Sequence, residues 1–320
     1  MTAVDLTNPI FSDPDKAREH FEAIRWPNGP YCPFCGVFDR VAVLGGKSMG
    51  PGWYHCKDCR KKFTAAVGTI YERSHIPLTK WLLATHLMCA SKKGMSAHQL
   101  HRMIGLPYKT AWFMAHRIRE GMRELNPPPM GGEGKTIEVD ETYVGGKERN
   151  KHRSKRNADH IGGVGKEAVF ALVERKGKVR SQHIPHVTAK TLRPILETQL
   201  NDISKTKLMT DGEGQYRLVA DMFASHEVVN HGIGEYVRGE AHTNTVEGYF
   251  SILKRGITGT YHHVSGQHLK RYLAEFDFRY NERAALEVTD AERATKAVNG
   301  VVGKRVTYQG TNRSRSEVAH

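Results

Sequence analysis

Four cysteines in two closely spaced pairs constrain this chain more than any other feature of its sequence. Cys32 and Cys35 form the first pair, and Cys56 and Cys59 form the second, separated by twenty residues. Two Cys-x-x-Cys turns at this separation are typical of a ribbon in which four thiolates bind one Zn²⁺ tetrahedrally. Because four protein ligands complete a tetrahedral ion, we predict that this Zn²⁺ is structural and that catalysis lies elsewhere.

The setting of the chain favours zinc over the alternative, which is a pair of disulfides. The first residues, MTAVDLTNPIF, have neither the basic nor the apolar segment of a signal peptide, and no apolar run is long enough for a membrane helix. We therefore expect a reducing, cytosolic location, where disulfides are rare.

The basic charge of the chain is concentrated around and after the ribbon. The formal net charge is +14, and residues 31–130 hold 15 Lys and Arg against 5 Asp and Glu. Such an excess indicates a polyanionic partner, with nucleic acid as the first candidate and a merely solubilising surface as the alternative. The ribbon residues expected to contact phosphates are Lys57, Arg60, Lys61 and Lys62.

A helical pattern follows the ribbon. Apolar residues recur at helical spacing over residues 77–94, 96–104 and 108–124, and Gly105 and Pro107 mark the turn before the last segment. Two helices joined in this way are typical of a helix-turn-helix motif, and an ordinary three-helix bundle with a basic surface is the alternative. The expected DNA contacts on the last helix are Lys109, Arg117 and Arg119.

The second half of the chain has an α/β pattern. Three consecutive prolines and three glycines between residues 126 and 134 separate it from the helices. Strands are predicted at 136–140, 167–174, 179–186, 207–211 and 227–230, and helices at 189–200, 242–255 and 267–283. The predicted divisions are a helical segment at 1–28, the ribbon at 29–68, a helix-turn-helix domain at 69–126, a linker at 127–135, a catalytic domain at 136–285 and a basic tail at 286–320.

Two acidic residues fall where strands of this pattern give way to loops, Asp140 and Asp211. Carboxylates in such positions suit Mg²⁺, because hard oxygen ligands bind the ion and leave positions for phosphate and water. The helix at 242–255 offers Glu247 as a third ligand, and Lys254 lies two turns further on the same face. Asn244 shares this face and stays open as an alternative to Glu247.

Glu141 is a weaker candidate, because adjacent residues of a strand point to opposite faces.

The spacing of Asp140, Asp211, Glu247 and Lys254 resembles the DDE signature of insertion-sequence transposases with a ribonuclease-H-like core. One group of these carries an N-terminal zinc ribbon. The segments VDETYVGGK, from Val139, and HTNTVEGYFSILKRGITGTYHHVSGQHLKRYLAEFDFRYNER, from His242, resemble the motifs of that group. The resemblance covers residues 20–285, approximately.

The resemblance implies a multi-domain DNA transposase, with the zinc ribbon, the helix-turn-helix domain and an α/β ribonuclease-H-like catalytic core. Such an enzyme binds the terminal inverted repeats of its element, hydrolyses the phosphodiester at each end and joins the 3′-hydroxyl to target DNA. Asp140, Asp211 and Glu247 would hold two Mg²⁺ or Mn²⁺ ions for this chemistry, and in parts of the group Asn is described at the third position. Pairing of two ends implies a homodimer or higher oligomer, acting at the nucleoid of a prokaryotic cytoplasm.

Two other functions stay open at this point. The first is a regulator that binds DNA without catalysis, and the second is a metal-dependent nuclease that cuts strands without joining them. The presence of three acids argues against the regulator, and an end-recognition module fits transposition better than cutting alone.

A run of six bases and one acid between residues 147 and 156 predicts a DNA-contacting loop beside the acids, with a solvated loop as a compatible alternative. The expected contacts in this loop and on the helix of Glu247 are Lys151, Arg153, Lys155, Arg156, Lys254 and Arg255.

Overall fold

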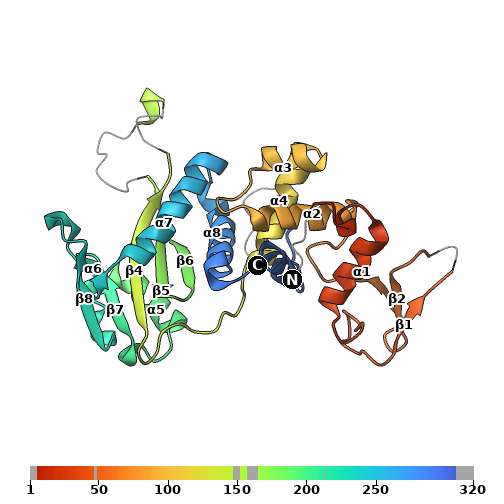
Figure 1. Cartoon of the computed structure of the whole chain (residues 1–320), viewed down its shortest axis with the longest axis horizontal. Coiled ribbons are helices and arrows are strands. Elements are labelled where there is room, and N and C mark those ends of the chain that lie inside the picture. The colour runs from red at the N-terminus through yellow and green to blue at the C-terminus, as the bar shows by residue number, and fades with distance from the viewer. Residues whose placement is uncertain (1–5, 47–48, 147–151, 157–164, 213, 308–320) are drawn as a thin grey trace. The chain divides into compact units, whose positions relative to one another are not determined.

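The computed structural model describes residues 6–46, 49–146, 152–156, 165–212 and 214–307 (Figure 1). The chain forms two compact units. The first runs to Ser91, continues over Met95–Arg123 and takes up the chain again from Val288, whereas the second comprises Lys92–Gly94 and Glu124–Glu287.

The first unit contains a small three-stranded sheet and a set of helices. Its elements are α1 (Pro14–Arg25), β1 (Val41–Leu44), β2 (Trp53–Cys56), β3 (Lys62–Thr64), α2 (Leu78–Ala90), α3 (Ala97–Ile104), α4 (Tyr108–Met122) and α9 (Asp290–Asn299). The strands pair antiparallel in the order β1-β2-β3. The three helices predicted after the ribbon are therefore present as α2, α3 and α4, and Gly105 ends α3 with a φ of +62°.

The expected boundary between residues 28 and 29 does not separate two packed bodies. Trp26, which follows α1, packs edge-on against Tyr54 of β2 and Phe63 of β3, with ring centroids 5.0 and 6.2 Å apart. Phe21 of α1 meets Tyr71 at 5.2 Å in the same way. The first helix and the ribbon thus share one aromatic core.

The expected tail at 286–320 is wrong over its first part. Thr289 and Glu292 form a capping box that begins α9, a signal present in the sequence. α9 packs against α2 and α4, and it buries Ala297 and Val298. The core of the first unit therefore includes α9, a helix that is more than 150 residues away in sequence from α2 and α4.

Packing of α9 on α4 predicts a large effect for Gly300→Ala. A Cβ at Gly300 would overlap the carbonyl oxygen of Gly121 in α4, and backbone cannot move aside as a side chain can. We expect the free energy of unfolding to fall by about 1–3 kcal/mol, as for other overpacked sites. Urea unfolding of Gly300→Ala and of Gly45→Ala checks this, because a Cβ at Gly45 would meet no atom within 4 Å. Equal stability of the two variants would contradict this packing of α9.

The second unit is built on a mixed sheet. Its elements are β4 (Thr136–Val144), β5 (Glu167–Glu174), β6 (Val179–Ile184), α5 (Ala189–Gln199), β7 (Lys207–Thr210), α6 (Gly214–Arg217), β8 (Ser225–Val228), β9 (Val237–Arg238), β10 (Ala241–His242), α7 (Asn244–Gly256), a π-helical turn (Ile257–Tyr261) and α8 (Gly266–Asn281). Over the described residues, five strands pair in the order β6-β5-β4-β7-β8. β4, β5 and β6 run antiparallel, whereas β7 and β8 run parallel to β4. This mixed α/β sheet is consistent with a ribonuclease-H-like core.

Helices cover both faces of this sheet, because alternate side chains of its strands are apolar on both sides. On β5, Val169, Ala171 and Val173 pack with α7 and α8. The residues between them, such as Phe170 and Leu172, pack with α5 on the other face. Figure 1 shows α7 crossing in front of β4, which it contacts directly.

The expected linker at 127–135 is also part of the second unit. Met130 is 4% exposed, and its N–H donates to the carbonyl of Gln199 at 2.9 Å. The main segment of the second unit begins at Glu124, slightly before the predicted boundary. Among the helices that the structure describes, none has the length and apolar character needed to cross a membrane.

Candidate metal centre and active site

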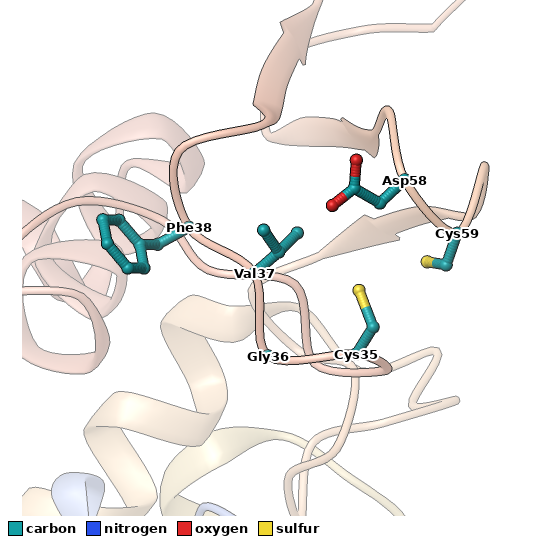
Figure 2. A pocket seen from close by; sticks show the side chains of 6 residues that line it. All are labelled: Cys35, Gly36, Val37, Phe38, Asp58 and Cys59. Carbon is teal, nitrogen blue, oxygen red and sulfur yellow. The ribbon is translucent and has the colours of Figure 1, made fainter.

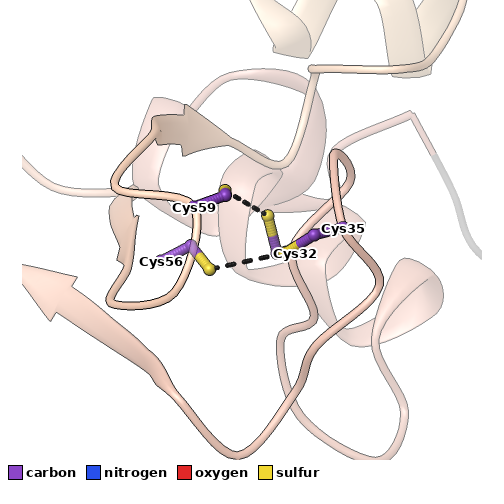
Figure 3. Close-up of side chains that lie close together, drawn as sticks. All are labelled: Cys32, Cys35, Cys56 and Cys59. Atoms are coloured by element: carbon purple, nitrogen blue, oxygen red, sulfur yellow. Dashed lines mark hydrogen bonds between the residues drawn. The ribbon is translucent and has the colours of Figure 1, made fainter.

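The four cysteines of the ribbon gather at one point of the first unit. The Sγ atoms of Cys32 and Cys59 lie 3.6 Å apart, as do those of Cys35 and Cys56 (Figure 3). All four Sγ atoms lie within 4.8 Å of one another. A tetrahedral Zn²⁺ with bonds of about 2.3 Å requires sulfurs about 3.8 Å apart, so the arrangement fits this ion.

Two similar turns position these thiols. The N–H of Cys32 donates to the carbonyl of Val37 at 2.8 Å, and the N–H of Cys56 donates to the carbonyl of Lys61 at 3.0 Å. Each turn then needs a left-handed residue, supplied by Gly36 at a φ of +80° and by Arg60 at +58°. The two Cys-x-x-Cys segments therefore form equivalent knuckles.

Hydrogen bonds within the first knuckle favour a thiolate at Cys32. Burial opposes ionisation of this thiol, but the backbone N–H groups of Phe34 and Cys35, together with the thiols of Cys35 and Cys59, outweigh it and lower its pKa to about 7. A thiolate is the form that binds Zn²⁺.

A shallow hollow lies on the outer side of the cysteine site (Figure 2). It is lined by Cys35, Gly36, Val37, Phe38, Asp58 and Cys59. Figure 2 shows the two cysteines on the side away from Phe38, whose ring is 73% exposed. Because Cys35 and Cys59 form one wall, the hollow belongs to the metal centre.

The basic residues predicted on the ribbon all lie at its surface. Lys57, Arg60, Lys61 and Lys62 are exposed. The ammonium of Lys61 lies 4.5 Å from the ring centroid of Phe34, which is itself 47% exposed. These side chains are free to meet a large partner without rearrangement of the ribbon core.

The three predicted contacts on α4 differ in their placement. Lys109, in the first turn, is exposed. Arg117 is half-buried over the ring of Trp81, and it donates to the carbonyl of Glu72 at 3.0 Å. Arg119 is only 2% exposed, so the expectation of a surface contact there is wrong. Arg119 lies one helical turn after the buried Ala115, on the face of α4 that is turned toward the core.

The acids of the second unit are brought together by the register of the sheet. β4 and β7 pair in parallel, with Thr136 opposite Lys207 and Glu138 opposite Met209. Continuing this register by two residues places Asp140 beside Asp211, on the same face. Asp140 lies inside β4, which continues to Val144, so the expectation that it ends a strand is wrong, whereas Asp211 directly follows β7.

Glu247 is near enough to Asp140 for its charge to act on the pKa of that residue. The pKa of Asp140 is raised to about 8, mainly by burial and then by the charges of Asp211, Glu141 and Glu247. The carboxylates therefore repel one another, and a bound divalent cation would relieve this repulsion. Among the described residues, only the cysteines form a group with all ligand atoms within 4.8 Å, so the acids are spaced more widely.

Glu247 and Asn244 both lie in the first turn of α7, but in different surroundings. Glu247 is half-buried and accepts a hydrogen bond from the Thr243 hydroxyl at 2.8 Å, and its carboxylate lies 3.4 Å from Nε2 of His231. Asn244 is exposed. Further along α7, Lys254 and Arg255 are also exposed, and Arg255 bonds to Ser251.

Glu141 points to the opposite face of β4. Its carboxylate accepts hydrogen bonds from Gln215, at 3.1 Å, and from the hydroxyl of Tyr216. Both residues belong to α6, which follows Asp211 in the chain. Glu141 thus ties α6 to the sheet from the side away from α7.

Sequence reasoning missed Glu138, a buried acid two residues before Asp140. Its carboxylate is fully buried and bonds to Arg175 and to the start of α7. The available signal was an acid within the otherwise apolar strand segment Ile137–Val139, on the same face as Asp140.

The basic loop at 147–156 is described only in part. Lys151 lies outside the described residues, and so does the side chain of Lys155. Arg153 and Arg156 are exposed, and Arg153–Lys155 forms a short 3₁₀ turn.

Fold and site together define a protein with a four-cysteine zinc ribbon and an α/β core on which several carboxylates lie near one another. Residues 12–62 match the family model of a transposase zinc-ribbon domain, and residues 131–281 match that of an ISXO2-like transposase domain. An uncharacterized protein in the transposable element ISH50 of Halobacterium salinarum is 33% identical over 265 residues, which cover 80% of this chain and 87% of the relative. The chain belongs to this family of insertion-sequence transposases.

Proposed function

We propose that this protein binds the terminal inverted repeats of its element, hydrolyses the phosphodiester at each end and joins the freed 3′-hydroxyl to target DNA. The observation that carries the proposal is the grouping of three acids. Asp140 of β4 and Asp211, which directly follows β7, are neighbours when the parallel register of the two strands is continued by two residues, and the charge of Glu247 contributes to the raised pKa of Asp140. Membership of the transposase family supports the same reaction.

In this proposal, Asp140, Asp211 and Glu247 hold Mg²⁺ or Mn²⁺. Two such ions, when bound, stabilise the attacking and leaving oxygens of an in-line displacement at phosphorus. The chain supplies hard oxygen ligands on rigid elements, and the exposed Lys254 and Arg255 on α7 would contact the DNA backbone nearby. Arg153 and Arg156 are proposed contacts of the same kind.

The first unit is proposed to recognise the DNA ends. The exposed bases of the ribbon suit phosphate contact, and exposed Lys109 begins the helix that would read DNA in a helix-turn-helix formed by α3 and α4. Arg119 takes no part because it is buried. Pairing of two ends requires at least two copies of the chain, assembled on DNA at the nucleoid.

A strand-transfer assay tests the proposal. Labelled duplex carrying the terminal inverted repeat is incubated with the protein, a target plasmid and Mg²⁺, with EDTA as the control. We expect nicked ends and joined products in the reaction with Mg²⁺ and neither product in the EDTA control. Nicking without joining would support a nuclease, and binding without nicking would support a non-catalytic regulator.

Comparison of Glu247→Ala with Asn244→Ala in this assay identifies the third ligand. Loss of a partly buried carboxylate near Asp140 is expected to slow cleavage by about 10²-fold or more. Asn244→Ala is expected to stay within about 3-fold of the unmodified protein, since an exposed amide is a poorer ligand for Mg²⁺. Loss of cleavage only in the Asn244 variant would overturn this assignment.

A further inference from the structure

Glu138 is a fully buried acid of the second unit that the proposed function does not use. Its side chain is 0% exposed. Oε2 accepts from the backbone N–H groups of Thr245 at 2.8 Å and Val246 at 3.0 Å. Oε1 accepts from the Thr245 hydroxyl at 2.8 Å and from Nε of Arg175 at 2.7 Å.

These bonds replace the cap that α7 lacks. The N-cap residue, Thr243, makes no side-chain capping bond, although the first N–H groups of a helix have no partner within it. Glu138, which lies on β4 more than a hundred residues earlier in the chain, accepts hydrogen bonds from two of these N–H groups. Its negative charge also suits the positive end of the helix dipole.

Arg175 extends the same contact to the segment before α7. While Nε bonds to Glu138, the other two nitrogens donate to the carbonyls of Glu240 at 2.8 Å and His242 at 2.9 Å. Both the entry to α7 and its first turn are therefore attached to β4 through the ion pair of Glu138 and Arg175, whose side chains are 0% and 17% exposed.

We propose that Glu138 is a positioning residue that sets the place of Glu247 relative to Asp140. Glu138 and Asp140 lie on the same face of β4, and Glu247 follows Val246 directly in the turn that Glu138 holds. One rigid strand thus carries the first acid and anchors the helix of the third. This inference rests on the proposed function, because it concerns how the same acids meet a metal ion.

The first test is metal binding by the full chain carrying Glu138→Gln. Glutamine keeps the size of the side chain but presents an NH₂ group where one oxygen accepted hydrogen bonds. We expect the dissociation constant for Mn²⁺, measured from the electron paramagnetic resonance of free Mn²⁺, to rise by about 10–100-fold, as for other residues that orient metal ligands. The Mg²⁺ concentration for half-maximal cleavage should rise in parallel.

Glu174→Gln is the matched control for a merely structural effect. Glu174 is also a largely buried carboxylate of this unit, with its side chain 16% exposed, and it accepts from the backbone N–H of Gly131 at 3.1 Å and from the ammonium of Lys135 at 3.0 Å, neither of which belongs to α7. Both variants should unfold at lower temperature, but only Glu138→Gln should change the metal requirement. Equal metal requirements in the two variants would overturn the inference.

A second variant keeps the test decisive if Glu138→Gln does not fold. Thr245→Val removes one hydrogen bond to Glu138 and keeps both backbone contacts, so a smaller shift in the same direction is expected. An unchanged Mn²⁺ affinity would again contradict the inference. If the unmodified protein neither binds Mn²⁺ nor cleaves, the proposed function fails, whereas normal binding with unshifted variants refutes only the role of Glu138.

Discussion

Asp140→Asn is expected to abolish strand cleavage while leaving binding to the terminal repeats intact. The substitution keeps the shape of the side chain and removes the charge that would hold a cation beside Asp211. Loss of one such electrostatic contribution typically costs about 10²–10³-fold in rate, and a direct metal ligand should cost at least as much. Cleavage of labelled repeat DNA in Mg²⁺ and a mobility-shift assay measure the two properties.

Removal of negative charge from crowded acids also relieves repulsion. The pKa of Asp140 is raised by burial and by its acidic neighbours, so Asp140→Asn should fold at least as stably as the unmodified protein. Inactivity then reflects lost chemistry and not unfolding. Asp221→Asn is the control, because its side chain is 69% exposed in an ion pair with Arg193. Normal cleavage by Asp140→Asn would refute the transposase mechanism.

Cys56→Ser is expected to empty the zinc site and unfold the ribbon. A structural Zn²⁺ contributes about 10–16 kcal/mol in small zinc domains, which exceeds or matches the whole stability of a typical domain. Serine does not form the thiolate that the ion requires. Zinc content per chain, by elemental analysis, should fall from one to near zero, and affinity for repeat DNA should fall with it.

Cys89→Ser separates loss of the metal from loss of a buried sulfur. Cys89 is as completely buried as Cys56, but it packs in α2, where its thiol contacts the carbonyl of Arg293 at 3.9 Å. This variant should be less stable yet keep one zinc per chain. A Cys56→Ser protein that retained full zinc and DNA affinity would contradict the four-cysteine site.

The features that sequence reasoning recovered are those determined by short stretches of chain. A Cys-x-x-Cys turn needs only a few residues to form, so the spacing of Cys32, Cys35, Cys56 and Cys59 identified the ligands directly. Alternating apolar residues predicted the positions of β4 and β7, and Asp140 and Asp211 were selected as candidates because they lie on or directly after these strands.

The features that sequence reasoning missed depend on contacts between distant segments. The cap of α9 was readable in Thr289 and Glu292, but its packing on α2 and α4 was not. Arg119 has the sequence character of a surface residue, and only the tertiary structure shows that it is buried. Glu138 is a single acid whose partners, Arg175 and Thr245, lie elsewhere in the chain.

The sequence by itself determined the chemistry available to this protein: four thiols for zinc, and carboxylates for a harder ion. Only the tertiary structure decided which carboxylates meet. The parallel register of β4 and β7 places Asp140 beside Asp211, and the buried contacts of Glu138 bring α7 with Glu247 to the same face. The physical reason is that ligand type is a property of a residue, whereas the geometry of a site is a property of the long-range hydrogen bonds and packing that join its elements.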